Sequence, residues 1–492
     1  MKNHRTILST ILLAILFLPA AAQQQSTLYY MNLPQAHLLN PALRSSNGFY
    51  LGLPGVSGIN INFNTNFIGY SDVFRLSANG DSILTPLHPD FDQDGFLKKI
   101  KNANFISPDV NIQTFGLGFK AGKDLYIFFD VNEKVDAGIS LPGDLFRLAL
   151  KGNEEFTGSK IDLTNFDARM TYYREVAAGF SKNVTPELRI GVRAKMLMGI
   201  ATMQVDNRNL TIDVLDDYAH RLATDMSVNI SGPVTVYLNN ENGLDSLTID
   251  EERLKDPSFY LSNRNPGFGI DIGAVYQLTP KISLSAAYNG FGTINWKSDI
   301  TTITAQNEFL FSGFDLTEVI DGTKDFEELA EELVDSLKNS FTITESPDAF
   351  RTFIPGTLTF GASYNLTKRL SVGAVSNTLF YKGKVRSSFM LSANANLGSA
   401  LSAGLSYTAI NSSYDNLGAG IAFRLGVVQF YTIADKIPLM YNKIIIPGDN
   451  PTSILLPDKW NTLTFRFGMN LVFGNKIKKK SDRPMIITTD PI

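Results

Sequence analysis

The sequence predicts an all-β fold: a transmembrane outer-membrane β-barrel of about 14 antiparallel strands, with an N-terminal plug or strap and long extracellular loops. Three observations predict it. The chain opens with an export signal, strands of about ten residues with alternating apolar side chains recur to its end, and short turns alternate with long insertions. Bacterial outer-membrane barrels combine these features, because each strand faces lipid on one side and the lumen on the other.

Residues 1–22 have the pattern of a secretory signal peptide. Two basic residues precede an apolar run over residues 7–18, and small residues lead to a cleavage point after Ala22. A retained membrane anchor is the alternative, but the apolar run is shorter than the ~20 residues that a spanning helix needs. We therefore expect export and localisation in the outer membrane.

The composition excludes several classes of protein. The 492 residues include no cysteine, so disulfides and thiol chemistry are excluded. The formal net charge of -4 and the lack of a broad basic stripe argue against nucleic acid as a partner.

Residues 23–56, at the mature N-terminus, do not fit a lipid-facing strand. Pro34, Pro41 and Pro54 each remove a hydrogen-bond donor from any strand ladder. The segment is predicted to be either a plug inside the barrel or a periplasmic strap across its first strands.

Strict alternation of apolar and polar residues marks the strands. In the last strand Leu463, Phe465 and Phe467 share one face, whereas Thr464 and Arg466 share the other. Residues 57–473 are predicted to form the barrel. The even number of strands and the short turns at one end predict that both mature termini are periplasmic. The predicted strands cover residues 57–68, 110–121, 124–140, 170–182, 187–203, 267–278, 281–296, 355–366, 369–381, 386–397, 400–412, 416–425, 427–435 and 462–473.

Long polar insertions separate these strands at the opposite end. Residues 308–345 contain leucines at helical spacing among acidic residues, which predicts an amphipathic helix that either caps the barrel or binds another protein. Residues 474–492 are predicted to be a basic periplasmic tail. The predicted extracellular insertions are residues 71–109, 203–266, 297–354 and 436–461.

Charged residues at lumen-facing positions are the main candidates for a functional site. They form either a structural ion-pair ladder or a solute path, because unpaired charge in a narrow barrel is costly. These candidates are Arg193, Lys195, Asp271, Arg424 and Arg466.

A weaker candidate is a calcium loop at "DFDQDG", with Asp90, Asp92 and Asp94 at alternating positions. The twelfth position of such a loop, where a bidentate Glu is needed, is Lys101. The histidines lack metal-ligand spacing, so we expect no metal site and no cofactor.

Two blocks, "TLYYMNLPQAHLLNPALRSSNGFYLGLPG" and "DLYIFFDVNEKVDAGISLPGDLFRLALKGN", resemble a Bacteroidota family of exported outer-membrane barrels of unknown function. More distantly, "LLNPAL" is similar to the Asn-Pro-Ala element of FadL-like fatty-acid transporters, and the chain also resembles PorP/SprF-like barrels of the type IX secretion and gliding machinery. The resemblance implies location and architecture but supplies no functional residue. Within the predicted plug or strap, the candidate plug residues are Asn40, Pro41, Ala42 and Leu43.

We therefore expect passive uptake or binding of a small hydrophobic solute. The alternative is a structural or assembly component that binds secretion-system or other envelope proteins. An enzyme is not expected, because no acid–base pair or nucleophile constellation is visible. The expected partners are outer-membrane lipids, a hydrophobic small molecule and envelope proteins.

Overall fold

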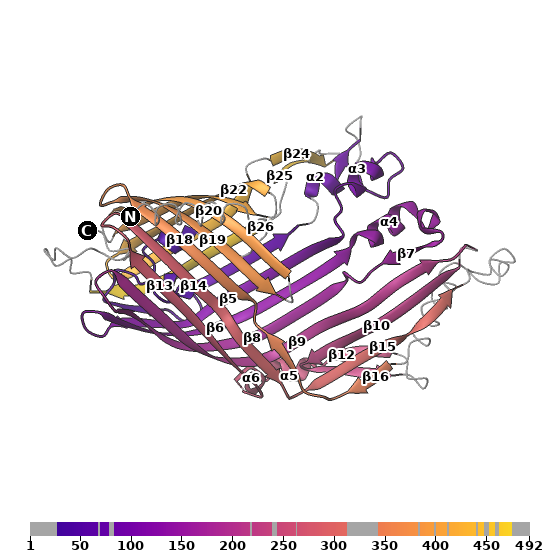
Figure 1. Ribbon diagram of the computed structural model, residues 1–492, viewed down its shortest axis with the longest axis horizontal. Coiled ribbons are helices and arrows are strands. Elements are labelled where there is room, and N and C mark those ends of the chain that lie inside the picture. The colour runs from indigo at the N-terminus through magenta and orange to yellow at the C-terminus, as the bar shows by residue number, and fades with distance from the viewer. Residues whose placement is uncertain are drawn as a thin grey trace, which may run out of the picture.

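The protein is a closed β-barrel, shown in Figure 1 as a computed structural model. The structure describes residues 27–66, 69–77, 83–216, 219–238, 244–261, 263–311, 343–381, 384–397, 400–410, 413–438, 441–446, 452–457 and 462–474. The predicted signal peptide, most of the basic tail and most of the predicted acidic helix therefore lie outside the described residues.

Within the described chain, fourteen strands pair with antiparallel neighbours around the barrel, and this confirms the predicted fold class. The first is interrupted at residues 53–57 and consists of β1 and β2, and it closes the barrel on β26 through pairs such as Tyr50 with Val472. The strands, in order around the barrel, are β1 (Phe49–Gly52) with β2 (Gly58–Thr65), β5 (Ala103–Lys120), β6 (Leu125–Pro142), β8 (Asp167–Asn183), β9 (Leu188–Val214), β13 (Asn265–Gln277), β14 (Ile282–Trp296), β18 (Gly356–Asn365), β19 (Leu370–Tyr381), β20 (Lys384–Leu397), β21 (Leu401–Ile410), β22 (Ser413–Leu425), β23 (Val428–Pro438) and β26 (Thr462–Phe473).

Every predicted strand overlaps one of these strands, but three predicted bounds are wrong. β5 begins at Ala103 rather than at residue 110, and β1 belongs to the barrel wall although residues 23–56 were predicted to be a plug or strap. The third concerns β9. The prediction ended the fifth strand at residue 203, whereas β9 continues to Val214. The extension persists because residues 202–214 find a new partner in β10 (His220–Ser231) once β13 has ended. Tertiary pairing thus extends a strand into a segment that was predicted to be an insertion.

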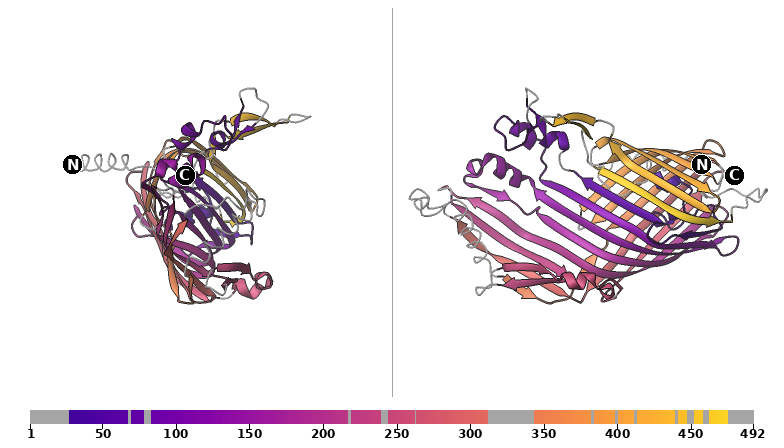
Figure 2. Two further views of the ribbon diagram at one scale, coloured as in Figure 1. Left: turned by 90° about the vertical axis from the view of Figure 1, so that its right-hand side faces the viewer. Right: turned by 180° about the vertical axis from the view of Figure 1, so that it is seen from behind.

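The remaining elements gather at the end of the barrel opposite the short turns (Figure 1). The hairpin β24–β25 lies beside the segment with α2 and α3 in Figure 1 and in the right-hand view of Figure 2. These elements are α2 (Tyr70–Val73), β3 (Arg75–Leu76), β4 (Ile83–Leu84), α3 (Gln93–Leu97), α4 (Gly143–Lys151), η3 (Glu154–Phe156), β7 (Ser159–Asp162), β10, β11 (Val234–Leu238), β12 (Leu244–Ile249), α5 (Glu251–Lys255), α6 (Pro257–Leu261), β15 (Ile300–Phe311), β16 (Ile343–Ser346), β17 (Phe350–Phe353), β24 (Tyr441–Ile446) and β25 (Thr452–Pro457).

The two faces of the barrel wall differ as the alternation predicts. On β13, Phe268, Ile272 and Tyr276 are 60%, 51% and 45% exposed, whereas Asp271 between them is 2% exposed and points inward. An apolar outer face with a polar inner face is typical of a transmembrane barrel. Among the described residues, no helix has the length and apolar character needed to cross a membrane.

Residues 27–48, here called the lumen segment, pack inside the barrel. They include two short 3₁₀ helices, η1 (Thr27–Tyr30) and η2 (Pro34–Leu38), and most of their side chains are buried. Hydrogen bonds join the segment to distant strands, including Tyr29 Oη with Ser285 Oγ and Gln35 Nε2 with Asn470 Oδ1. The segment therefore fills part of the lumen and is held from several sides.

Glycines on the inner face of the wall make room for this segment. A Cβ added at Gly191 would lie 2.2 Å from the carbonyl carbon of Pro41 and 2.3 Å from the amide nitrogen of Ala42. Both are backbone atoms, so a side-chain rotation could not relieve the clash.

We predict that Gly191→Val destabilises the protein by about 1–3 kcal/mol, the usual cost of overpacking a filled interior. The matched control is Ala194→Val on the exposed face of the same strand. Urea unfolding measures the free energy of unfolding of each variant, and the loss of heat-modifiable migration in gels reports the unfolded fraction. Equal stability of the two variants would contradict the observed packing of the lumen segment.

Candidate functional site

A cluster of charged side chains lies on the inner wall at the level of the lumen segment. At its centre is Arg193 on β9, which is 2% exposed. Its guanidinium donates from Nε to Asp130 Oδ2 at 3.1 Å, from Nη2 to Glu175 Oε1 at 2.5 Å and from Nη1 to Asp271 Oδ2 at 3.0 Å. One arginine therefore joins carboxylates from three other strands.

Strand register explains this convergence. Arg193 is the direct cross-strand partner of Asp271 on β13, and all these residues occupy inward positions of their strands. Two lysines complete the cluster: Lys195 Nζ lies 2.5 Å from Asp271 Oδ1, and Lys134 Nζ lies 2.9 Å from Glu175 Oε2. The three carboxylates are thus matched by three cations, which buried charges require.

The lumen segment contributes His37 to the same cluster. Its Nε2 lies 2.9 Å from Asp130 Oδ1, and its Nδ1 lies 2.6 Å from the carbonyl oxygen of Pro34. Both ring nitrogens therefore face oxygen atoms that accept hydrogen bonds. The charge cluster therefore fixes the lumen segment to the wall.

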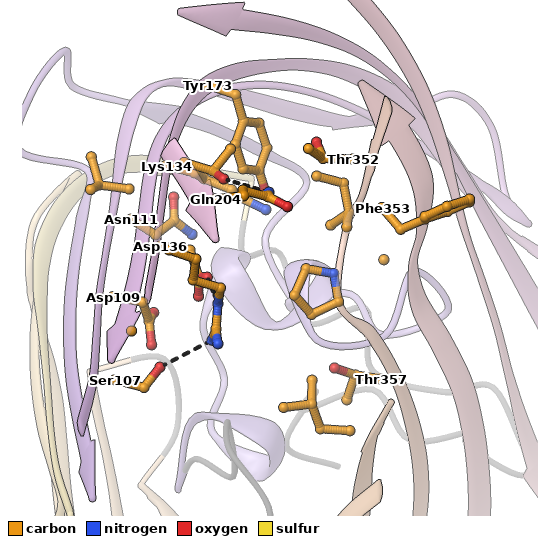
Figure 3. Close-up of a pocket in the computed structure, with 18 of the residues that line it drawn as sticks. Ser107, Asp109, Asn111, Lys134, Asp136, Tyr173, Gln204, Thr352, Phe353 and Thr357 are labelled. Atoms are coloured by element: carbon orange, nitrogen blue, oxygen red, sulfur yellow. Dashed lines mark hydrogen bonds and ion pairs between the residues drawn. The ribbon is translucent and has the colours of Figure 1, made fainter. Parts of the chain in front are cut away.

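A cavity of about 420 Å³ lies next to this cluster (Figure 3). Leu38 and Leu39 of the lumen segment line it, together with side chains from both sides of the barrel. In Figure 3, Asp109, Asn111 and Asp136 extend into it from one wall, and Thr352 and Thr357 lie on the opposite side. The volume falls in the range typical of small-molecule sites.

Two arginines lie in the part of the cavity that is lined by the far ends of β5, β6 and β8. Arg386 on β20 stacks on Phe105 of β5, with its guanidinium carbon 3.7 Å from the ring centroid. Because β20 and β5 are not neighbours in the barrel, this contact bridges the lumen. Arg169 lies in the same part of the cavity and donates to Asp136 Oδ1 at 3.2 Å.

The structure brings together four of the five predicted lumen charges. Arg193, Lys195, Asp271 and Arg466 all line the cavity. Arg424 lies apart, near the short turn between β22 and β23, where it donates to the carbonyl oxygens of Gly426 at 2.7 Å and Val472 at 2.9 Å.

The candidate plug residues lie where the lumen segment meets the wall. Asn40 Nδ2 donates to Tyr29 Oη at 3.1 Å, and Asn40 Oδ1 accepts from the amide nitrogen of Ala42 at 2.9 Å. Leu43 is buried, with its amide nitrogen 2.8 Å from the carbonyl oxygen of Asn40. Asn40 thus holds the turn in which Pro41 and Ala42 approach Gly191.

Sequence reasoning missed several members of the site. Asp130, Lys134 and Asp136 occupy alternate positions of β6, and Arg169 and Glu175 occupy inward positions of β8. Four of these residues lie in the predicted strands 124–140 and 170–182, where the alternation of side chains could have identified them as inward-facing. Arg169 lies one residue before the second predicted strand.

The aspartates of the weak calcium candidate are engaged separately. Asp92 accepts from the amide nitrogen of Gly95 at 2.9 Å and caps α3, and Asp94 pairs with Lys151 of α4 at 2.7 Å. The hydrogen bond from Lys151 holds the pKa of the Asp94 carboxyl below its usual range. In the described part of the chain, no group of three or more His, Cys, Asp or Glu residues could hold a metal ion.

These features define a class of protein: a membrane-type β-barrel whose lumen contains an N-terminal segment, a balanced charge cluster and a cavity. The chain belongs to a family of unknown function, DUF5723, whose model matches residues 41–435. This confirms the predicted membership in a family of unknown function. Its restriction to Bacteroidota and the likeness to PorP/SprF-like barrels stay predictions.

Comparison with solved structures finds other barrels of similar length. A FadL homologue from Pseudomonas aeruginosa is 12% identical with a TM-score of 0.41, and the match covers 93% of this chain and 100% of that one. The toluene transporter TodX from Pseudomonas putida is 9% identical with a TM-score of 0.40, over 92% and 98% of the two chains. None of the curated proteins matches. The function must therefore be argued from the residues of this chain.

The charge cluster makes a prediction about stability. Replacing Arg193 with Met should cost about 3–5 kcal/mol, because it leaves three buried carboxylates short of a partner. The control, Arg208→Met on the outer part of β9, removes an exposed pair with Asp225 and should cost about 0.2–1 kcal/mol. The free energies of unfolding of the two variants are compared by urea unfolding in lipid vesicles, with tryptophan fluorescence as the signal. Similar losses for both variants would show that the cluster does not hold the barrel together.

Proposed function

We propose that this protein is an outer-membrane channel that holds a small solute in its lumen and releases it when the lumen segment moves. The observation that carries the proposal is the cavity between the lumen segment and the Arg386–Phe105 contact. In this proposal the signal peptide directs export, both mature termini are periplasmic, and the apolar outer face contacts outer-membrane lipids.

The cavity lining supports an amphipathic solute. Apolar surface comes from Leu38, Leu39, Ile354 and Pro355, which suits the hydrophobic part that the sequence led us to expect. Charged and amide side chains from β5, β6 and β8 line the cavity as well. A purely hydrophobic molecule would leave these polar groups desolvated, so the solute should also present hydrogen-bonding groups.

The lumen segment supports a gated path. Four of its residues hold it to the wall through hydrogen bonds rather than through a covalent link. They are Thr27, Gln35, His37 and Asn40. Such contacts can break and reform, whereas the closed strand ladder of the barrel cannot open without losing many hydrogen bonds at once. We therefore infer that the lumen segment is the moving part.

The alternative, an assembly component that binds envelope or secretion-system proteins, stays a prediction. The segment that motivated it, residues 308–345, lies largely outside the described residues. We infer no catalytic role, because most of the charged groups around the cavity form ion pairs. The paired cations are Lys134, Arg169, Arg193 and Lys195.

A reversible cross-link tests the gate. Thr27 Oγ1 and Ser406 Oγ are 2.9 Å apart, and the chain has no native cysteine, so the double variant T27C/S406C should form one disulfide between the lumen segment and the wall. We expect openings in planar bilayers bathed in KCl after reduction and none after oxidation, because the oxidised segment cannot leave its site.

The control is T378C/S387C, whose parent hydroxyls are 3.0 Å apart on neighbouring wall strands. It should open in both redox states. Openings of the oxidised T27C/S406C protein would exclude the lumen segment as the gate, and a lack of openings in every reduced form would overturn the channel proposal.

A further inference from the structure

A row of three polar side chains crosses the cavity wall where the barrel closes. Asn60 on β2 is the cross-strand partner of Arg466 on β26 and of Asn111 on β5. All three residues line the cavity, and Asn111 is labelled in Figure 3. Because neighbouring strands lie about 4.8 Å apart, the row extends over about 10 Å.

Each member of the row has an unsatisfied polar atom. Within the described residues, Arg466 Nε, Asn60 Oδ1 and Asn111 Oδ1 are buried and have no hydrogen-bond partner. Arg466 is 8% exposed and Asn60 is 9% exposed. Buried polar groups are normally hydrogen-bonded, so three such atoms in one row of a cavity wall point to a ligand.

Arg466 also lacks a paired counter-ion in the part of the chain that the structure describes. Asp435 and Asp109 are close enough to influence its charge, but neither forms an ion pair with it. One oxygen of each carboxylate accepts from another donor, whereas Asp435 Oδ2 has no hydrogen-bond partner among the described residues. Asp435 accepts from the amide nitrogen of Thr27 at 3.0 Å, and Asp109 accepts from Asn62 Nδ2 at 3.0 Å.

An anionic group of the solute would supply the missing partner. A buried guanidinium without a counter-ion is costly, and a carboxylate satisfies it through charge-assisted hydrogen bonds. The two amide oxygens, in contrast, require hydrogen-bond donors, which a hydroxyl group provides. Arg466 and the asparagines therefore select different groups on one short molecule.

We propose that this row is a binding subsite for a small hydroxylated organic acid. The carboxylate binds Arg466, a hydroxyl group donates to Asn60 or Asn111, and the apolar chain between them faces Leu38 and Leu39. The inference rests on the proposed function, because it assumes that the cavity holds the solute.

Calorimetric titration of the folded full-length protein tests the subsite with three probes of equal chain length: ω-hydroxyhexanoate, hexanoate and hexanediol. We expect wild type to bind ω-hydroxyhexanoate most tightly. Arg466→Gln should weaken binding of both acids by about tenfold to a hundredfold, the usual effect of losing hydrogen bonds to a charged group. It should leave hexanediol unchanged.

The asparagines are tested separately. Asn111→Ala should weaken the binding of ω-hydroxyhexanoate by about twofold to tenfold. It should leave the binding of hexanoate unchanged, because hexanoate has no hydroxyl group that could donate to Asn111. The matched control is Arg351→Gln, which removes an exposed arginine that bonds Asn295 and does not line the cavity. It should bind all three probes as wild type does.

Heat-modifiable migration in gels checks that each variant is folded. A second variant, Arg466→Lys, keeps the positive charge and should bind the two acids with an affinity between those of wild type and Arg466→Gln. Equal acid affinity in wild type and Arg466→Gln, or no acid binding by wild type, would overturn the inference. Calorimetry does not require the channel to open. If the protein binds the acids but shows no openings in bilayers, only the channel proposal is wrong. If it shows openings but binds no acid, only the subsite inference is wrong.

Discussion

The structure depends on the pairing of charge inside a closed barrel. Arg193 lies between Asp130, Glu175 and Asp271, and each of its three guanidinium nitrogens contacts a different strand. In a lumen this enclosed, any one of these groups left alone would be destabilising, because its desolvation would not be offset. The cluster therefore fixes the relative register of four neighbouring strands, and through His37 it also fixes the lumen segment.

The same constraint shapes the remainder of the lumen. The lumen segment can reach the charge cluster because glycines on the wall allow its backbone to approach. Gly191 admits Pro41 and Ala42, and Gly373 admits the ring of Tyr30, where an added Cβ would lie 2.4 Å from a ring carbon. Small residues on the wall and apolar residues on the segment are thus complementary, and the space that they leave is the cavity.

The cavity is polar where the barrel closes and partly apolar where the lumen segment lines it. This division follows from the origin of its surfaces. The strands present to the lumen the side chains that cannot face lipid, whereas Leu38 and Leu39 come from a segment that packs as a small core. A solute in this space meets both environments, which is the basis for an amphipathic ligand. The wall where the barrel closes differs from the other walls because Arg466, Asn60 and Asn111 each present an unsatisfied polar atom there.

The sequence by itself determined the barrel, the number of strands and the face on which each side chain lies. It could do so because alternation has a fixed period of two and because lipid favours apolar residues at outward positions. It also identified Arg193, Lys195, Asp271 and Arg466 as inward charges from parity alone. Only the tertiary structure decided which of these charges meet, why β9 continues to Val214 and why Arg424 lies apart from the cavity. These outcomes depend on strand register and on contacts between residues hundreds of positions apart, such as Gln35 with Asn470, and no local pattern in the chain encodes such contacts.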